Sequence, residues 1–285
     1  MLHRITFYSA IALLVFTAAC RRSAFSYVSK GNQLFEQGKF EEASLNYRKA
    51  IQVNANYGPA FYGLAMAALK GNHPADVPPN LTRAVELSPN DKNARAKLAD
   101  LLLSLYLTNR ARPKARYDQL NEMADKILAE DPGSYDGHRL RGYLAFEDRK
   151  PDEALNQFQA ASRAKPNDLD VEFMIAQITL QQNAEVGEHQ TRAIIESHPD
   201  YGPAYDLLYS YLESKKQYSD AEAVLQLKSE RNPNQPRYGI QLAQHYQRRG
   251  DSVKRDAVLD KIATNPKNHP EAVLAVGAFE AGIGE

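Results

Sequence analysis

The side chains that could support acid–base or metal chemistry are scattered along this 285-residue chain. None of the seven histidines forms an HExxH motif, and none stands beside a cysteine or carboxylate at the spacing of metal ligands. The phosphate loop GxxxxGK(S/T), the dinucleotide turn GxGxxG and the nucleophile elbow GxSxG are also missing from the sequence. We therefore expect a protein that is not an enzyme and that uses no metal and no other cofactor.

The acidic residues and the histidines have ordinary structural explanations. Acidic pairs such as Glu41-Glu42 and Asp152-Glu153 stand where helices are predicted to begin, and acids in a first turn interact favourably with the helix dipole. His138 stands at a packing position, so we expect a histidine whose ring nitrogens are satisfied between helices. Lys+Arg and Asp+Glu both number 35, and this balance argues against a general nucleic-acid binder, which carries a basic excess.

Cys20 is the one side chain whose position indicates a specific chemistry. It follows fifteen uncharged residues, 5–19, which is short for the roughly 17–25 residues of a bilayer-spanning helix but fits the apolar part of a signal peptide. The residues Thr-Ala-Ala-Cys that end at Cys20 resemble a bacterial lipobox, with Thr at the place where Leu is commonest. The resemblance implies a lipoprotein signal peptide over residues 1–19 and a lipidated Cys20 that anchors the chain. Because residue 21 is not Asp, it implies an outer-membrane lipoprotein facing the periplasm of a bacterial cell envelope.

Two other interpretations of the N-terminus stay open. A plain signal peptide cut after Ala19 would leave Cys20 incidental and the protein secreted or periplasmic. Alternatively, the apolar stretch would remain uncleaved as an anchor. Arg21 and Arg22 stand against the lipoprotein interpretation, because positive charge directly after an apolar segment opposes export.

The rest of the chain repeats with a period of about 34 residues. The fourth unit has its marker residues at repeat positions 8, 20, 24, 27 and 32, namely Gly142, Ala154, Phe158, Ala161 and Pro166. The first unit has Gly31, Ala43, Tyr47 and Ala50 at the first four of these positions. This pattern resembles the tetratricopeptide repeat (TPR), a helix–turn–helix unit. The resemblance implies an all-α fold, a TPR superhelical solenoid of about seven repeats plus a partial eighth.

The expected repeat domain covers residues 20–285. Its units are near 24–57, 58–91, 92–134, 135–168, 169–201, 202–235 and 236–268, with the partial unit at 269–285. Small residues at three positions let paired helices approach closely, and a proline near the end of most units stops the second helix. The second helix of the second unit should be short, because Val77-Pro78-Pro79 stands at its beginning.

Two parts of the repeat depart from the pattern. The third unit is about nine residues too long, with four basic residues between Leu105 and Gln119; they indicate either a solvated extension or longer helix pair, or a basic docking loop for an acidic partner or lipid headgroups. The final segment carries no charge between Glu271 and Glu280. It would be a poor cap, a docking surface, or a place where the native array continues.

In the TPR family the first helices of the units line a concave groove, which is the expected binding site for a peptide segment of a protein partner. In this register the early and middle groove is aromatic and apolar, and its candidate residues are Phe25, Asn32, Phe35, Tyr62, Met66, Arg139, Tyr143, Phe146 and Phe173. The late groove is polar, with Asp206, Ser210, Glu213, Arg237, Gln244, Gln247 and Arg248. Aromatic side chains in a groove suit peptide ligands, although each ring could instead pack between repeats.

The whole chain resembles bacterial TPR lipoproteins, which scaffold envelope machines, including those of exopolysaccharide export and surface-protein sorting. The resemblance implies a membrane-anchored scaffold or adaptor that mediates protein–protein interactions in an envelope assembly or export system. A carbohydrate-binding export component is an alternative, with Tyr62, Tyr143 and Phe146 stacking on sugar rings. A spacer without a groove ligand, taken from a longer array, is another.

Overall fold

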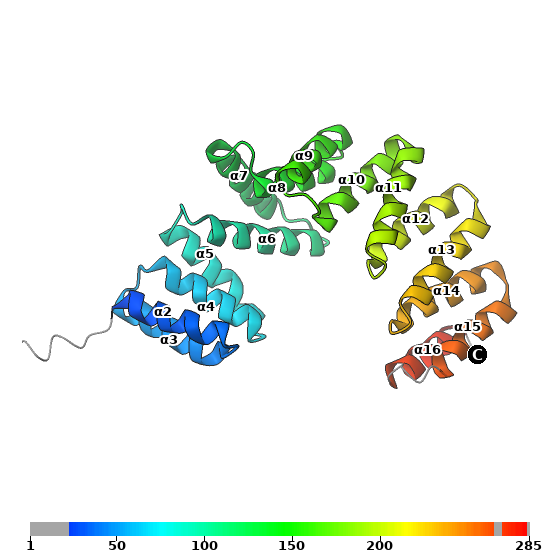
Figure 1. Ribbon diagram of the computed structural model, residues 1–285, viewed down its shortest axis with the longest axis horizontal. Coiled ribbons are helices and arrows are strands. Elements are labelled where there is room, and N and C mark those ends of the chain that lie inside the picture. Colours follow the sequence, from blue (N-terminus) through cyan, green and yellow to red (C-terminus); the bar gives the residue numbers. More distant parts are fainter. Residues whose placement is uncertain (1–22, 265–269, 284–285) are drawn as a thin grey trace, which may run out of the picture. The chain divides into compact units, whose positions relative to one another are not determined.

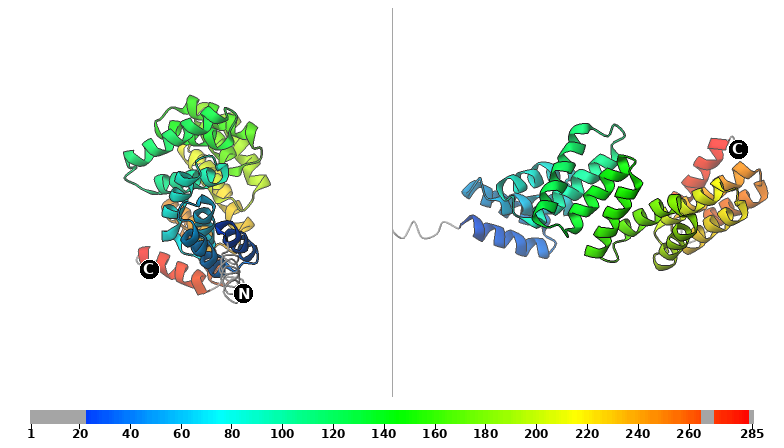
Figure 2. Two further views of the ribbon diagram at one scale, coloured as in Figure 1. Left: turned by 90° about the vertical axis from the view of Figure 1, so that its left-hand side faces the viewer. Right: turned by 90° about the horizontal axis from the view of Figure 1, so that it is seen from above.

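The structure, a computed structural model, describes residues 23–264 and 270–283. Over these residues it contains α-helices, one short 3-10 helix and no strand (Figures 1 and 2). The predicted all-α fold is therefore confirmed. The predicted signal peptide and Cys20 lie outside the described residues.

The helices follow one another in pairs (Figure 1). The first helices of the pairs are α2 (Ala24–Glu36), α4 (Gly58–Lys70), α6 (Lys92–Thr108), α8 (Tyr135–Glu147), α10 (Leu169–Gln182), α12 (Gly202–Ser214) and α14 (Pro236–Arg249). The second helices are α3 (Phe40–Val53), α5 (Val77–Leu87), α7 (Lys114–Glu130), α9 (Pro151–Ala164), α11 (Ala184–Ser197), α13 (Tyr218–Arg231) and α15 (Ser252–Thr264), and α16 (Pro270–Ile283) follows them. The chain forms two compact units, residues 1–123 and 124–285, with the boundary in the sequence within α7. We call these two parts the first unit and the second unit, and we call each helix pair a repeat.

A proline follows most of the second helices at the same distance from the end of the helix. The helices α5, α7, α9, α11 and α13 each end two residues before a proline: Pro89, Pro132, Pro166, Pro199 and Pro233. A proline cannot continue a helix, since it has no amide hydrogen and its ring clashes with the preceding turn. The chain therefore leaves each second helix and begins the next first helix after a short turn.

Small residues allow the first unit to close around one buried ring. Tyr47 of α3 is 2% exposed, and its ring lies against Gly31 of α2 and Gly63 of α4. A methyl group on either glycine would collide with that ring. The Tyr47 hydroxyl donates a hydrogen bond to Oδ1 of Asn32 at 2.8 Å, so the ring is buried while its polar end is satisfied. Burial, with Glu36 second, raises the pKa of Tyr47 to about 12.

The same arrangement recurs in the second unit around Phe158 of α9. Phe158 is fully buried, and Gly142 of α8 faces its ring closely enough that a Cβ would not fit. Ala154 of α9 is also fully buried and belongs to the same apolar cluster. The small residues at these repeat positions therefore leave room for a neighbouring aromatic ring, as the sequence predicted.

Replacing Ala154 by leucine is expected to lower the free energy of unfolding by about 1–3 kcal/mol, because the larger side chain overpacks a fully buried helix contact. Ala164 is a matched control, since it lies in the same helix and is exposed. Thermal unfolding of both variants checks the prediction. Equal melting temperatures for the Ala154 variant and the native chain would mean that the helix contact is looser than described.

The extra length of the third repeat lies in its helices. Both α6 and α7 have 17 residues, whereas α5 has only 11, as expected from its two prolines. Two basic side chains at the junction of α6 and α7 form contacts with neighbouring residues of the same segment. Arg112 donates to the Tyr106 carbonyl oxygen at 2.8 Å, and Lys114 Nζ lies 2.7 Å from an Asp118 carboxylate oxygen.

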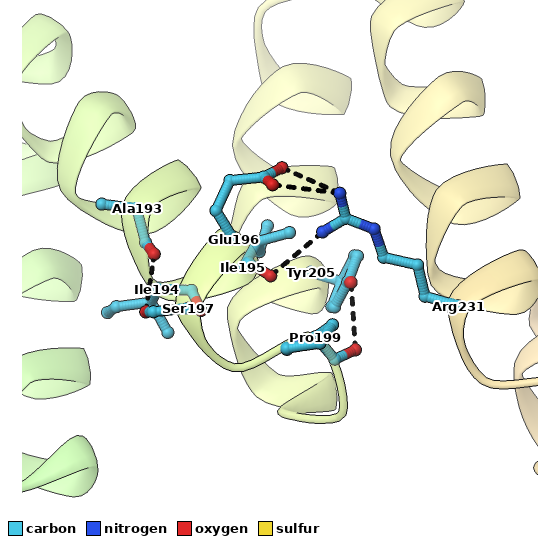
Figure 3. A network of polar contacts seen from close by, with 8 residues as sticks. All are labelled: Ala193, Ile194, Ile195, Glu196, Ser197, Pro199, Tyr205 and Arg231. Carbon is cyan, nitrogen blue, oxygen red and sulfur yellow. Dashed lines mark hydrogen bonds and ion pairs between the residues drawn. The ribbon is translucent and has the colours of Figure 1, made fainter.

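Polar contacts tie successive second helices together in the second unit (Figure 3). At the end of α13, Arg231 donates from Nη2 to both carboxylate oxygens of Glu196 on α11, at 3.1 and 3.0 Å. Its Nη1 donates to the Ile195 carbonyl oxygen at 3.2 Å, and the Tyr205 hydroxyl donates to the Pro199 carbonyl oxygen at 3.0 Å. The bonds of Arg231 connect residues about one repeat apart and link α13 to α11, whereas the Tyr205 bond ties α12 to the turn before it.

The helix α16 has one packed face and one open face. Ala272 and Val276 are buried with Phe279 against the cluster formed by α14 and α15. Val273 and Leu274 are 59% and 72% exposed. Packing therefore uses only part of the apolar surface of this helix.

Candidate peptide-binding surface

In the first unit the candidate residues lie on α2 and α4. Phe25 is 69% exposed and lines a shallow hollow on α2 with Ser26, Ser29, Lys30 and Gln33. Tyr62 and Met66 of α4 are half-buried. Phe25, Tyr62 and Met66 therefore keep surface that a partner could contact.

Asn32 and Phe35 have structural contacts inside the first unit. Asn32 is exposed, but its side chain accepts the hydrogen bond from buried Tyr47. Phe35 packs edge-on against Phe40, with ring centroids 5.3 Å apart, and contacts the apolar cluster. These two side chains contribute to packing as well as to the surface.

In the second unit the candidate residues are brought close to one another. Arg139, Tyr143 and Phe146 lie on α8, and Phe173 lies on α10, all of them half-buried. The Tyr143 ring packs edge-on against Phe158, with centroids 5.1 Å apart, so one side of the ring is fixed. The Arg139 guanidinium lies over the Tyr135 ring at 5.6 Å. Packing thus holds these side chains in place while each keeps exposed area.

A carboxylate and a further tyrosine complete this region, and sequence reasoning missed both. Tyr201, which directly precedes α12, packs edge-on against Phe173 with centroids 5.6 Å apart, and its hydroxyl donates to Asp170 Oδ1 at 3.4 Å. Burial raises the pKa of Tyr201, and Asp170 raises it further. Burial, with Asp170 second, also raises the pKa of Tyr143. Asp170 therefore sits near both tyrosine hydroxyls, and we call Tyr143, Phe173, Tyr201 and Asp170 the aromatic patch.

The sequence does contain a signal for Tyr201. The four residues Tyr-Gly-Pro-Ala occur twice, at 57–60 and at 201–204, and each copy precedes or begins a first helix. The glycine at each copy allows a close approach: a Cβ on Gly58 would collide with Ser88, and one on Gly202 would crowd the Tyr238 hydroxyl. The repeated sequence therefore marks Tyr201 as the residue that directly precedes a closely packed helix start.

The late, polar part of the surface is a hydrogen-bonded network on α12, α13 and α14. Lys228 is 1% exposed, and its Nζ lies 2.6 Å from Asp206 Oδ1 and 2.8 Å from Gln241 Oε1. Gln241 donates to the same Asp206 oxygen at 2.6 Å. The buried lysine is therefore satisfied by a carboxylate and an amide, as a buried charge requires.

His245 of α14 belongs to a second group of polar contacts between α12 and α14. Its ring is 2% exposed, and its Nδ1 lies 3.2 Å from the Tyr209 hydroxyl. That hydroxyl accepts a hydrogen bond from Arg248 at 2.8 Å, so it can donate its own proton to the histidine. Burial lowers the pKa of His245, although Glu213 opposes the shift.

These contacts hold aromatic and charged side chains in defined positions on the first helices. Within residues 23–264 and 270–283, the structure has no cluster of three or more His, Cys, Asp or Glu side chains suited to a metal ion. The predicted interhelix histidine, His138, has its ring nitrogens 2.8 Å from Gln157 Oε1 and 2.9 Å from the Pro132 carbonyl oxygen, which confirms that it is satisfied. Among the described helices, none has the length and apolar character that crossing a bilayer would require.

Known proteins resemble this chain in its repeats and in its fold. The TPR repeat family matches residues 31–70. The human protein O-mannosyl-transferase TMTC3 is 29% identical over 130 residues, which are 45% of this chain and 14% of that protein. The chain therefore spans only about a seventh of that relative's length.

Two solved structures resemble the chain in fold. MamA from Desulfovibrio magneticus RS-1 has a TM-score of 0.51 at 14% identity, with 65% of this chain and 99% of that chain covered. A chain of the APC/C hetero-tetramer Cut9-Hcn1 has a TM-score of 0.58 at 15% identity, with 78% of this chain and 43% of that chain covered. At these identities the likeness concerns the fold alone. The helix pairs, the match over residues 31–70 and the likeness to these solenoids together show that this chain has a tetratricopeptide-repeat fold.

Proposed function

We propose that this protein is a non-catalytic adaptor that holds a segment of a partner protein on the first helices of its second unit. The observation that carries the proposal is the aromatic patch, in which Tyr143, Phe173 and Tyr201 are fixed by edge-on contacts and remain partly exposed beside Asp170. Pre-positioned aromatic side chains lose little conformational freedom on binding, and such residues dominate the energy of protein interfaces. Repeat solenoids use extended surfaces of this kind to bind partners.

The proposal includes a location. A lipidated Cys20 would anchor the chain, as an outer-membrane lipoprotein facing the periplasm, in an envelope assembly or export system such as exopolysaccharide export or surface-protein sorting. The support for this part is the lipobox-like sequence that ends at Cys20. One acyl chain gives only marginal membrane binding, so stable anchoring needs the several chains of a mature lipoprotein.

Cys20→Ser is expected to move the protein from the membrane fraction to the soluble or periplasmic fraction, because the acyl chains can no longer be attached. Fractionation of cells that express the native and the variant chain, followed by immunoblotting, measures this shift. Mass spectrometry of the native protein should detect acylated Cys20. Membrane retention of the variant would count against lipidation and favour an uncleaved apolar anchor.

The adaptor proposal is tested by purifying tagged native protein from solubilised bacterial envelopes and identifying the bound proteins by mass spectrometry. We expect a small set of defined subunits of one envelope system, bound in proportion to the bait. Phe173→Ala should lose them. A native bait that captures no more than an untagged control would overturn the adaptor proposal and leave the spacer interpretation.

A carbohydrate ligand is the second candidate, because a tyrosine ring next to a carboxylate can stack on a sugar and accept its hydroxyl hydrogens. Tyr201 and Asp170 provide that pair, and Tyr62, Tyr143 and Phe146 are further half-buried rings. Titration with purified polysaccharide while tyrosine fluorescence is recorded tests it. Unchanged fluorescence at millimolar sugar would remove this candidate.

A further inference from the structure

Within the part of the chain that the structure describes, two arginines on α14 have no ion pair, whereas three carboxylates of the neighbouring helices α12 and α13 are paired with other cations. On α12, Asp206 is paired with Lys228 at 2.6 Å and Glu213 with Arg249 at 2.7 Å. On α13, Glu222 is paired with Lys254 of α15 at 2.8 Å. Among the described residues, Arg237 and Arg248 have no carboxylate within ion-pair distance. Neither guanidinium is therefore paired with a carboxylate of the described helices.

Both arginines are held in defined positions by tyrosines. Arg237 donates from Nη2 to the Tyr238 hydroxyl at 3.1 Å, and its guanidinium lies 4.8 Å from the centre of that ring. Arg248 donates from Nη2 to the Tyr209 hydroxyl at 2.8 Å. Each guanidinium has five N–H donors, so most of the donors of each remain for a ligand. A pre-positioned arginine binds a carboxylate better than a mobile one, because less side-chain entropy is lost.

The two arginines lie on one face of α14. They are eleven residues apart, which is close to three turns, and Gln241 and Gln244 lie between them on the same face. Gln241 and Arg248 bond to residues of α12, so this face is continuous with the surface formed by the first helices. At about 1.5 Å per residue, the arginines are separated by about 16 Å along the helix.

We propose that α14 recognises an acidic segment of the partner protein, with one carboxylate on Arg237 and another on Arg248. An extended chain rises about 3.3 Å per residue, so acidic residues about five positions apart span the same 16 Å. Gln244 is exposed between the arginines and provides an amide for the peptide backbone. This inference rests on the proposed function and adds the charge and spacing of the segment that the adaptor binds.

A random dodecapeptide display library, selected on the purified full chain, tests the inference. We expect enriched peptides with Asp or Glu at two positions four to six residues apart, and we expect this enrichment to disappear for R237Q and R248Q. A synthesised enriched peptide should bind at least about tenfold more weakly when its two acids are changed to Gln, and its affinity should fall as salt concentration rises. Each arginine variant should weaken binding of the acidic peptide about five- to tenfold.

Arg163 supplies the matched control. It is an exposed arginine on α9 with no ion pair among the described residues, so R163Q removes the same charge away from α14. Equal weakening by R163Q, enrichment of basic or neutral peptides, or no enrichment at all would overturn the inference. The adaptor proposal is judged separately by capture from envelopes: partners that R237Q and R248Q still capture, but Phe173→Ala does not, would support the adaptor and refute the acidic segment.

Discussion

Replacing Tyr47 by alanine is expected to destabilise the first unit by about 3–5 kcal/mol, the cost of removing a large buried ring and leaving a cavity. Tyr47 is 2% exposed and is enclosed by Gly31, Gly63 and the apolar cluster of α2, α3 and α4. The glycines cannot refill the space, because they carry no side chain. Hydrogen exchange of peptides from α2, α3 and α4 gives a local measurement, which suits a repeat array better than one global transition.

Tyr47→Phe is the matched control. It keeps the ring and removes only the hydrogen bond to Asn32, so it should cost about 0.5–1.5 kcal/mol. Exchange in α12, α13 and α14 of the second unit should stay unchanged in both variants. If alanine and phenylalanine have the same small effect, the ring does not carry the packing of the first unit.

Phe173→Ala is expected to reduce the partner protein captured from envelopes at least about tenfold, which corresponds to the loss of one strong interface contact of about 1.4 kcal/mol or more. The Phe173 ring holds Tyr201 by its edge-on contact and carries exposed area of its own. Removing it therefore takes away a contact and frees a second aromatic side chain. Quantitative mass spectrometry at matched bait amounts provides the measurement.

Two further variants separate binding from folding. Phe173→Leu keeps apolar packing with the neighbouring clusters but removes the aromatic face, so it should bind weakly while its melting temperature stays close to that of the native chain. Val186→Ala removes an exposed apolar side chain from α11, a second helix of the same unit, and should capture the partner normally. Loss of capture in the Val186 variant, or normal capture in both Phe173 variants, would place binding elsewhere.

The fold could be predicted from the sequence, because the residues that determine it act locally and recur in each repeat. Prolines such as Pro166 and Pro199 end helices through their own backbone chemistry, whatever surrounds them. Small residues such as Gly142 and Ala154 recur at positions where a neighbouring ring needs space. The short α5 follows from the prolines at its start. Each of these signals lies within a single repeat of about 34 residues.

The candidate site could be predicted only in part, because its contacts join residues that are distant in the sequence, such as Tyr201 and Asp170, which are 31 positions apart. The register identified Tyr143 and Phe173 on first helices, but it placed Tyr201 at the end of the repeat 169–201 without a role and gave no role to Asp170. Their meeting depends on how α8, α10 and α12 are placed in space. The same holds for the arginines of α14: the composition shows equal numbers of charges, and only the pairing of each carboxylate reveals which cations are left over.

The central claim is that a partner protein lies on the first helices of the second unit, and site-specific photocrosslinking tests it most directly. A photoreactive phenylalanine analogue is placed at Phe146 on α8 in one variant and at Val186 on α11 in another, and both are irradiated in intact envelopes. Our account predicts a crosslinked partner from position 146 and none from position 186. A crosslink from position 186 alone, or from neither position while the partner is still captured, would contradict it.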